Sequence, residues 1–186
     1  MKFEAIEKKE RGKFINRYDI HYETEDGEKK VYEMISRNPD IRTKEELLNP
    51  KADAVVIIMH NEEGDKILLN REFRLAVGAW VYNFPAGLID AGETAKESAV
   101  RELKEETGLD VIEIRDTLYD SYSAIGFSNE KNVCVIGTAQ GTFSESTSNV
   151  EEIEAGWYTK EEVSNLLKGE LFAARTQAYC YMWSKE

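Results

Sequence analysis

The sequence has few cysteines, no long apolar run and no concentration of basic residues, and each absence excludes a class of protein. Its two cysteines, Cys134 and Cys180, lie far apart and outside any C-x-x-C or metal-ligand spacing, so we expect buried thiols and no disulfide framework. No segment approaches the roughly 18 apolar residues of a membrane span. The first residues, MKFEAIEKKERGKF, are highly charged and lack the apolar core of a signal peptide. Together these features predict a cytoplasmic protein with no membrane partner.

The charge balance is acidic, with 36 Asp and Glu residues against 24 Lys and Arg residues. Because no Lys- or Arg-rich stripe is present, a nucleic-acid duplex is not an expected partner. Hydrophobic residues make up 41% of the 186 residues, enough for the core of one domain with a small appendage. An acidic protein that binds phosphate groups needs a cation between its carboxylates and the phosphate, and a divalent metal ion is the natural candidate. The plainer alternative is that the charge only keeps the protein soluble.

The pattern of apolar residues predicts strands and helices in mixed order. Asp26-Gly27 is placed to turn a hairpin between residues 18–24 and 30–35. Further strands are expected at 54–59, 66–73, 111–121, 132–140 and 152–158, and helices at 95–107, after Thr159 and within 170–184. This order predicts an α/β (α+β) fold, in which helices pack on the faces of a mixed sheet.

Three expected helix starts carry a threonine followed three residues later by a glutamate, which is the pattern of a capping box. The pairs are Thr43 with Glu46, Thr94 with Glu97, and Thr159 with Glu162. Gly108 is a natural residue to end the helix that Thr94 begins.

The helix expected at 95–107 concentrates carboxylates on one side. At 100° per residue, Glu102, Glu105 and Glu106 fall within an arc of roughly 100°. Arg101 stands four residues after Glu97 and four before Glu105, so it can pair with both. Crowded carboxylates repel one another, and a hard cation such as Mg²⁺ would neutralise them. The alternative is an ordinary solvated acidic face with ion pairs along the helix.

Residues 87–109, GLIDAGETAKESAVRELKEETGL, match the pattern G-x5-E-x7-R-E-U-x-E-E-x-G-U at every position, where U is aliphatic. This segment resembles the Nudix box. The matching residues are Gly87, Glu93, Arg101, Glu102, Leu103, Glu105, Glu106, Gly108 and Leu109. The resemblance implies the Nudix fold, an α/β/α sandwich around a mixed sheet. It also implies metal-assisted attack of water on a diphosphate phosphorus, with Mg²⁺ or Mn²⁺ as the cofactor.

The same resemblance implies roles for individual residues. The expected metal ligands are Glu102 and Glu106, with Glu105 assisting and the carbonyl oxygen of Ala86 completing the site. Arg101 and Glu93 would orient these groups.

The general base of the family often lies in a loop motif like E-x-I-E, which Glu151-Glu152-Ile153-Glu154 is similar to. Glu151 is therefore the expected base, with Glu152 and Glu145 as alternatives. An acidic loop that only faces solvent is equally compatible with the sequence.

The flanking sequence resembles the ADP-ribose pyrophosphatase branch of the family. The similar segments are REFR at 71–74, NFPAGLID at 83–90 and GFSNE at 126–130. The resemblance implies an N-terminal β-hairpin extension at 1–48, exchanged between the subunits of a homodimer, and a Nudix hydrolase domain at 49–186. The implied substrate contacts are Phe14 and Tyr32 on either side of the base, Glu33 beside them, Arg37 and Arg74 at phosphate, and Leu88.

The expected reaction converts ADP-ribose to AMP and ribose 5-phosphate. The branch usually carries a proline before the glycine of its downstream motif, whereas Ile125 precedes Gly126 here. A related nucleotide sugar is therefore an alternative substrate, and a nucleoside triphosphate is another. A non-catalytic nucleotide-sensing module on the same fold is the alternative of a different class.

Overall fold

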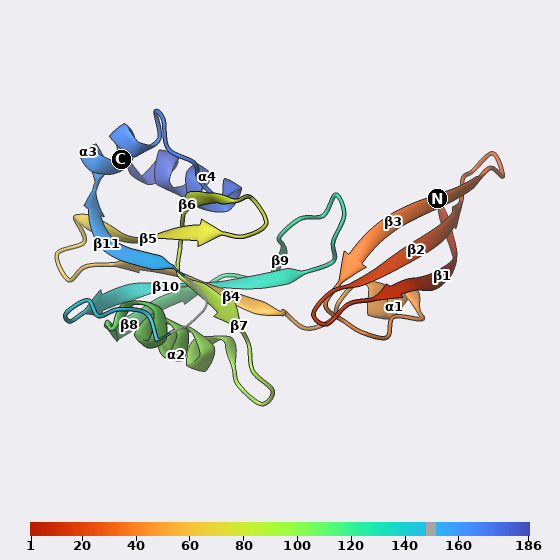
Figure 1. Cartoon of the computed structure of the whole chain (residues 1–186), viewed down its shortest axis with the longest axis horizontal. Coiled ribbons are helices and arrows are strands. Elements are labelled where there is room, and N and C mark those ends of the chain that lie inside the picture. The colour runs from red at the N-terminus through yellow and green to blue at the C-terminus, as the bar shows by residue number, and fades with distance from the viewer. Residues whose placement is uncertain (148–151) are drawn as a thin grey trace. The chain divides into compact units, whose positions relative to one another are not determined.

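The computed structural model describes residues 1–147 and 152–186, drawn in Figure 1. It divides into two compact units, Met1–Asp53 with Asp120–Asn132, and Ala54–Tyr119 with Val133–Glu186. The strands are β1 (Lys2–Arg11), β2 (Asn16–Glu23), β3 (Lys29–Ser36), β4 (Ala54–His60), β5 (Lys66–Arg74), β6 (Ala79–Asn83), β7 (Ala86–Leu88), β8 (Asp110–Thr117), β9 (Ser121–Tyr122), β10 (Lys131–Gln140) and β11 (Ile153–Thr159). The helices are α1 (Lys44–Leu47), α2 (Ala95–Thr107), α3 (Lys160–Leu166) and α4 (Ala174–Trp183).

The first unit is built on an antiparallel sheet in the order β1-β2-β3. The predicted hairpin is confirmed, since Gly27 turns the chain between β2 and β3 with a φ of 81°, which glycine adopts without a steric penalty. One face of the sheet buries Tyr18, Ile20 and Met34 against Ile41. The segment 120–132 joins this unit through the Ile35 amide, which donates to the Phe127 carbonyl at 2.8 Å.

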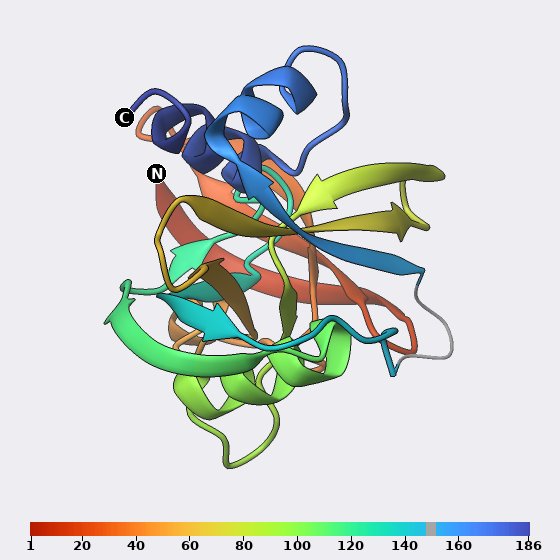
Figure 2. The same ribbon diagram turned by 90° about the vertical axis from the view of Figure 1, so that its left-hand side faces the viewer.

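The second unit holds a larger sheet in the order β11-β5-β4-β10-β8, to which β6 and β7 add at β5 and β4. The central strand β4 is buried along almost its whole length. Its residues alternate between two cores, with Val56 and Ile58 in one and Val55 and Ile57 in the other, because successive side chains of a strand point to opposite faces. Helix α2 covers one face, and α3 and α4 cover the other (Figures 1 and 2). This is the expected helix–sheet–helix sandwich.

Two stretches differ from the pattern expected from the sequence. Residues 79–83 and 86–88, expected as irregular chain, form β6 and β7 because they pair with β5 and β4. The expected strand at 111–121 is divided into β8 and β9, which pair with different parts of β10.

The remaining expectations for local structure are confirmed. All three Thr–Glu capping boxes are present. Helix α4 turns Thr176, Cys180 and Trp183 into the core, and both cysteines are buried free thiols. None of the helices in residues 1–147 and 152–186 is long and apolar enough to cross a bilayer.

Candidate active site

Helix α2 carries the acidic residues of the site, and its ends and core contacts fix how they point. Thr94 caps the first turn, and Gly108 ends the helix with a φ of 78°. Ala99 and Leu103 are fully buried against the sheet. Because these anchors fix the rotation of the helix, the arc that holds the glutamates is fixed as well.

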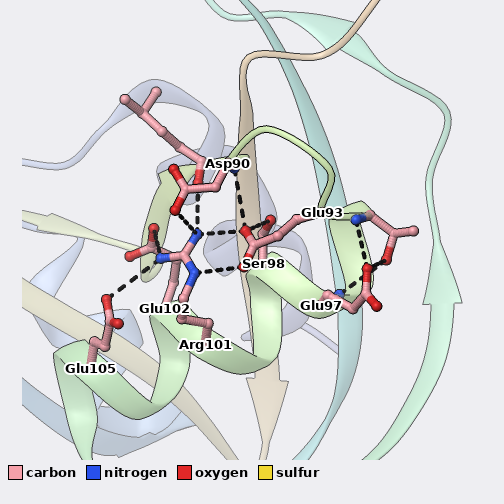
Figure 3. A network of polar contacts seen from close by, with 9 residues as sticks. Asp90, Glu93, Glu97, Ser98, Arg101, Glu102 and Glu105 are labelled. Carbon is pink, nitrogen blue, oxygen red and sulfur yellow. Dashed lines mark hydrogen bonds and ion pairs between the residues drawn. The ribbon is translucent and has the colours of Figure 1, made fainter.

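Arg101 is the centre of the polar network on α2 (Figure 3). Its guanidinium donates to both carboxylate oxygens of Glu93, from Nε at 2.9 Å and from Nη2 at 2.8 Å. Its Nη1 donates to Glu102 Oε1 at 2.7 Å and lies 3.5 Å from Glu105 Oε2. Its Nη2 also lies 3.8 Å from Asp90 Oδ2. One cation therefore orients several carboxylates, a task that suits the planar, multi-donor guanidinium.

The expected pairing of Arg101 with Glu97 is wrong. Glu97 instead accepts the Thr94 amide at 2.8 Å and the Thr94 hydroxyl at 2.8 Å, completing the capping box. Arg101 turns to Glu93 in the loop before the helix, because a bidentate contact holds the guanidinium better than one i,i+4 pair does.

The network shifts the pKa values of its members in opposite directions. Hydrogen bonds from Arg101 and Ser98 lower the pKa of Glu93 to about 2, so its carboxylate is ionised at neutral pH. The same contacts, led by Glu93, raise the pKa of Arg101 well above its usual value. Burial raises the pKa of Glu102, an effect that the hydrogen bond from Arg101 opposes. The uncharged form of Glu102 is thus favoured by desolvation and its charged form by Arg101.

Gly87, at the centre of β7, lies against the carboxylate of Glu102. A methyl group at Gly87 would overlap the Glu102 carboxyl group. The backbone of β7 at Gly87 therefore lies against this acid, and a larger residue there would displace the Glu102 carboxylate. A cradle of this kind, made of backbone and half-buried carboxylate, supplies the oxygen ligands that Mg²⁺ prefers.

Glu106 is the most buried acid of α2, and its partner was not foreseen from the sequence. Its Oε2 accepts a hydrogen bond from Asn70 Nδ2 of β5 at 2.7 Å, and both residues are buried. No sequence motif marks Asn70; the one available signal is its position directly after the apolar residues 67–69 of β5.

The acids of α2 meet the chemical requirement for a divalent cation, although they are not already arranged around one point. Across residues 1–147 and 152–186, no three Asp, Glu, His or Cys side chains form a ready-made metal cluster. Glu102 and Glu105 are turned toward Arg101, and Glu106 toward Asn70. The donor set fits a hard cation in chemistry, and ligation would require Glu102 to turn from Arg101.

Comparison with known proteins decides the family. Residues 50–180 match the NUDIX domain model. The chain belongs to the Nudix family. The box residues described above are therefore those of a Nudix domain.

Several Nudix proteins are similar to this chain. "Putative nudix hydrolase 2" of Caenorhabditis elegans is 40% identical over 99 residues, which are 52% of this chain and 42% of that protein. "ADP-ribose pyrophosphatase" of Saccharomyces cerevisiae is 32% identical over 128 residues, which are 67% of this chain and 52% of that protein. The chain thus spans about half or less of the length of these two relatives. The fold matches a crystal structure described as ADP compounds hydrolase with a TM-score of 0.75, over 100% of this chain and 95% of that one, at 22% identity.

The expected general base of the Nudix reaction, Glu151, lies outside the described residues. The segment before it packs on the end of the box helix: the Ser144 amide donates to the Thr107 carbonyl at 3.0 Å, and the Thr147 amide to the Glu105 carbonyl at 3.0 Å. Both alternative bases are exposed, Glu145 within that segment and Glu152 just before β11.

Two of the expected substrate contacts belong to the same unit as the Nudix box. Arg74, at the end of β5, pairs with Glu72 at 3.4 Å and is largely exposed. Leu88 of β7 is half-exposed, and its carbonyl accepts a hydrogen bond from Arg101 Nη2 at 3.1 Å.

The other expected substrate contacts belong to the first unit. Phe14 is 67% exposed in the turn before β2, and Tyr32 of β3 is 38% exposed. Tyr32 donates its hydroxyl to the Gly126 carbonyl and lines a cavity of about 220 Å³. Glu33 pairs with Arg17 at 2.9 Å, and Arg37 with Glu130 at 2.7 Å. No ring contact joins Phe14 to Tyr32 within the described chain.

Proposed function

We propose that this Nudix protein hydrolyses the diphosphate bond of a nucleoside diphosphate derivative, with ADP-ribose as the first candidate and AMP and ribose 5-phosphate as products. The observation that carries the proposal is the Arg101 network, which gathers Glu93, Glu102 and Glu105 on the box helix. Three carboxylates outnumber the one cation that pairs with them, and a bound divalent cation would balance the remaining negative charge.

Glu102 and Glu106 would hold Mg²⁺ or Mn²⁺, with Glu105 assisting and the Ala86 carbonyl completing the ligand set. Bound metal would neutralise phosphate oxygens and lower the pKa of the attacking water. Arg101, held by its ion pair with Glu93, would keep Glu102 and Glu105 oriented between turnovers. Glu151 would accept the proton of the attacking water, with Glu152 and Glu145 as alternatives.

The base of the substrate would lie between Phe14 and Tyr32, contributed by the two subunits of a homodimer with exchanged N-terminal strands. Exposed aromatic rings such as Phe14 offer faces on which a purine stacks. Glu33 and Leu88 would flank the nucleoside, and Arg37 and Arg74 would contact phosphate. The similarity to the yeast protein called ADP-ribose pyrophosphatase supports this substrate class.

A panel of about twenty nucleoside diphosphate and triphosphate compounds, each with Mg²⁺, with Mn²⁺ and with EDTA, tests the proposal. We expect AMP and ribose 5-phosphate from ADP-ribose with metal and no product with EDTA. Release of pyrophosphate from nucleoside triphosphates, with ADP-ribose inert, would favour the alternative that the substrate is a nucleoside triphosphate. The substitution of Ile125 for the usual proline makes other nucleotide sugars the second candidates. Tight ADP-ribose binding without product under any metal would indicate a sensor instead of an enzyme.

A further inference from the structure

Asn70 is a buried polar residue at the centre of β5, directly after the apolar residues 67–69 and directly before Arg71 and Glu72. It is 1% exposed, and Leu68 and Leu69 immediately before it are fully buried. In the sheet it is paired with Asn83 of β6 and Ala155 of β11. Asparagine is depleted in strands, and a buried amide must find hydrogen-bond partners to avoid a desolvation cost. The position is therefore a poor one for asparagine as far as the fold is concerned.

Only one end of the Asn70 side chain is satisfied among the described residues. Nδ2 donates to Glu106 Oε2 at 2.7 Å. Oδ1 is buried without a hydrogen-bond partner in the part of the chain that the structure describes. A leucine, which has the same number and branching of heavy atoms, would remove this unsatisfied acceptor and pack with its apolar neighbours. Compared with leucine, asparagine at this position contributes one further interaction, the hydrogen bond to Glu106.

Whether the hydrogen-bond donor is charged or neutral affects how well a carboxylate can bind a cation. Arg101 binds Glu102 as a cation and so cancels part of its charge. The amide of Asn70 is neutral, so its hydrogen bond orients the Glu106 carboxylate without placing a cation beside it. A neutral hydrogen-bond partner of this kind orients a metal ligand without competing with the metal.

We propose that Asn70 is a positioning residue for divalent-cation binding, because it holds the Glu106 carboxylate in its metal-binding orientation from the neighbouring strand. This inference rests on the proposed function, in which Glu106 is a metal ligand. It assigns part of the site to β5, outside the box helix. Asn70 itself touches neither metal nor substrate in this assignment.

Mn²⁺ titration of the full chain without substrate, followed by the electron paramagnetic resonance signal of free Mn²⁺, tests the assignment. Asn70→Leu keeps the number and branching of the side-chain heavy atoms and removes the donor. We expect its dissociation constant for Mn²⁺ to rise about tenfold or more, as for other residues that orient metal ligands. Asn70→Ser, whose hydroxyl is too short to reach Glu106, should show the same loss and serves if the leucine variant does not fold.

Thr138→Val is the matched control, because Thr138 of β10 is also buried in the same unit with an unsatisfied side-chain oxygen. It should bind Mn²⁺ like the wild type. Circular dichroism and unfolding midpoints show that each variant is folded. A folded Asn70→Leu variant with wild-type Mn²⁺ affinity would overturn the role of Asn70 and leave the proposed function standing. A wild-type protein that binds no Mn²⁺ at millimolar concentration would overturn the proposed function and the inference with it.

Discussion

Gly87 and Glu102 are in such close contact that any side chain at position 87 would overlap the Glu102 carboxylate. The backbone conformation of Gly87 is not in the left-handed region, so an added side chain would act by displacing the Glu102 carboxylate and not through backbone strain.

Gly87→Ala should lower kcat/KM by about 100-fold while the protein stays folded, because a displacement of roughly 1 Å in a catalytic group costs that much. Steady-state kinetics and circular dichroism measure the two effects. Gly169→Ala is the control, since a methyl group at Gly169 meets no atom within 4 Å. Equal activity of the two variants would show that the position of Glu102 does not matter for turnover.

Glu106→Gln should reduce turnover by about 1,000-fold, because a neutral amide loses the charge with which the acid holds the cation, an effect of several kcal/mol. Glu97→Gln is a matched control on the same helix, since Glu97 serves the capping box and glutamine can replace glutamate there. We expect Glu97→Gln to keep at least half of the wild-type rate. A Glu106→Gln variant with comparable activity would exclude Glu106 as a metal ligand.

The low pKa of Glu93 predicts a specific dependence of stability on pH. Its pKa falls from 4.5 to about 2 on folding, so the unfolded chain takes up the proton first as the pH decreases. The stabilisation is complete above about pH 4.5 and is lost progressively toward pH 2. Urea unfolding between pH 7 and pH 3 should therefore show a smaller acid-induced loss of stability for Glu93→Gln than for the wild type. Parallel curves for the two proteins would contradict the ion pair with Arg101.

Phe14→Ala should raise the KM for ADP-ribose about tenfold and leave the unfolding midpoint unchanged, since an exposed ring contributes to base stacking and little to the core. Tyr119→Ala is the control, because Tyr119 is 92% exposed and has no expected substrate role. Light scattering at micromolar concentration should give twice the 21.3 kDa chain mass. A monomer, or an unchanged KM in Phe14→Ala, would contradict the shared base site.

Local signals explain which parts of the fold were predictable. The bounds of α2 follow from Thr94, Glu97 and Gly108, all within the helix or beside it. Strands β6 and β7 were missed because Pro85 and Gly87 interrupt the pattern, and only pairing with β5 and β4 makes these segments strands. In the same way, the segment 120–132 joins the first unit through contacts distant in sequence, such as Ile35 with Phe127.

In the candidate site, too, the features set by nearby residues were predictable and those set by distant contacts were not. The acids of the box were identifiable because their spacing is short and fixed. Of the two predicted partners of Arg101, Glu105 is confirmed and Glu97 is wrong, since helix geometry alone could not show that Glu93 lies within reach from the preceding loop. Asn70 was not identified at all, because its contact with Glu106 spans 36 positions.

In the proposed mechanism, Glu102 and Glu106 together hold a divalent cation. Anomalous diffraction from crystals soaked in Mn²⁺ locates the ion. We expect a manganese peak bonded to both carboxylates, with Glu102 turned away from Arg101. Crystals that contain Mn²⁺ elsewhere, but show these two carboxylates apart with no peak between them, would contradict it.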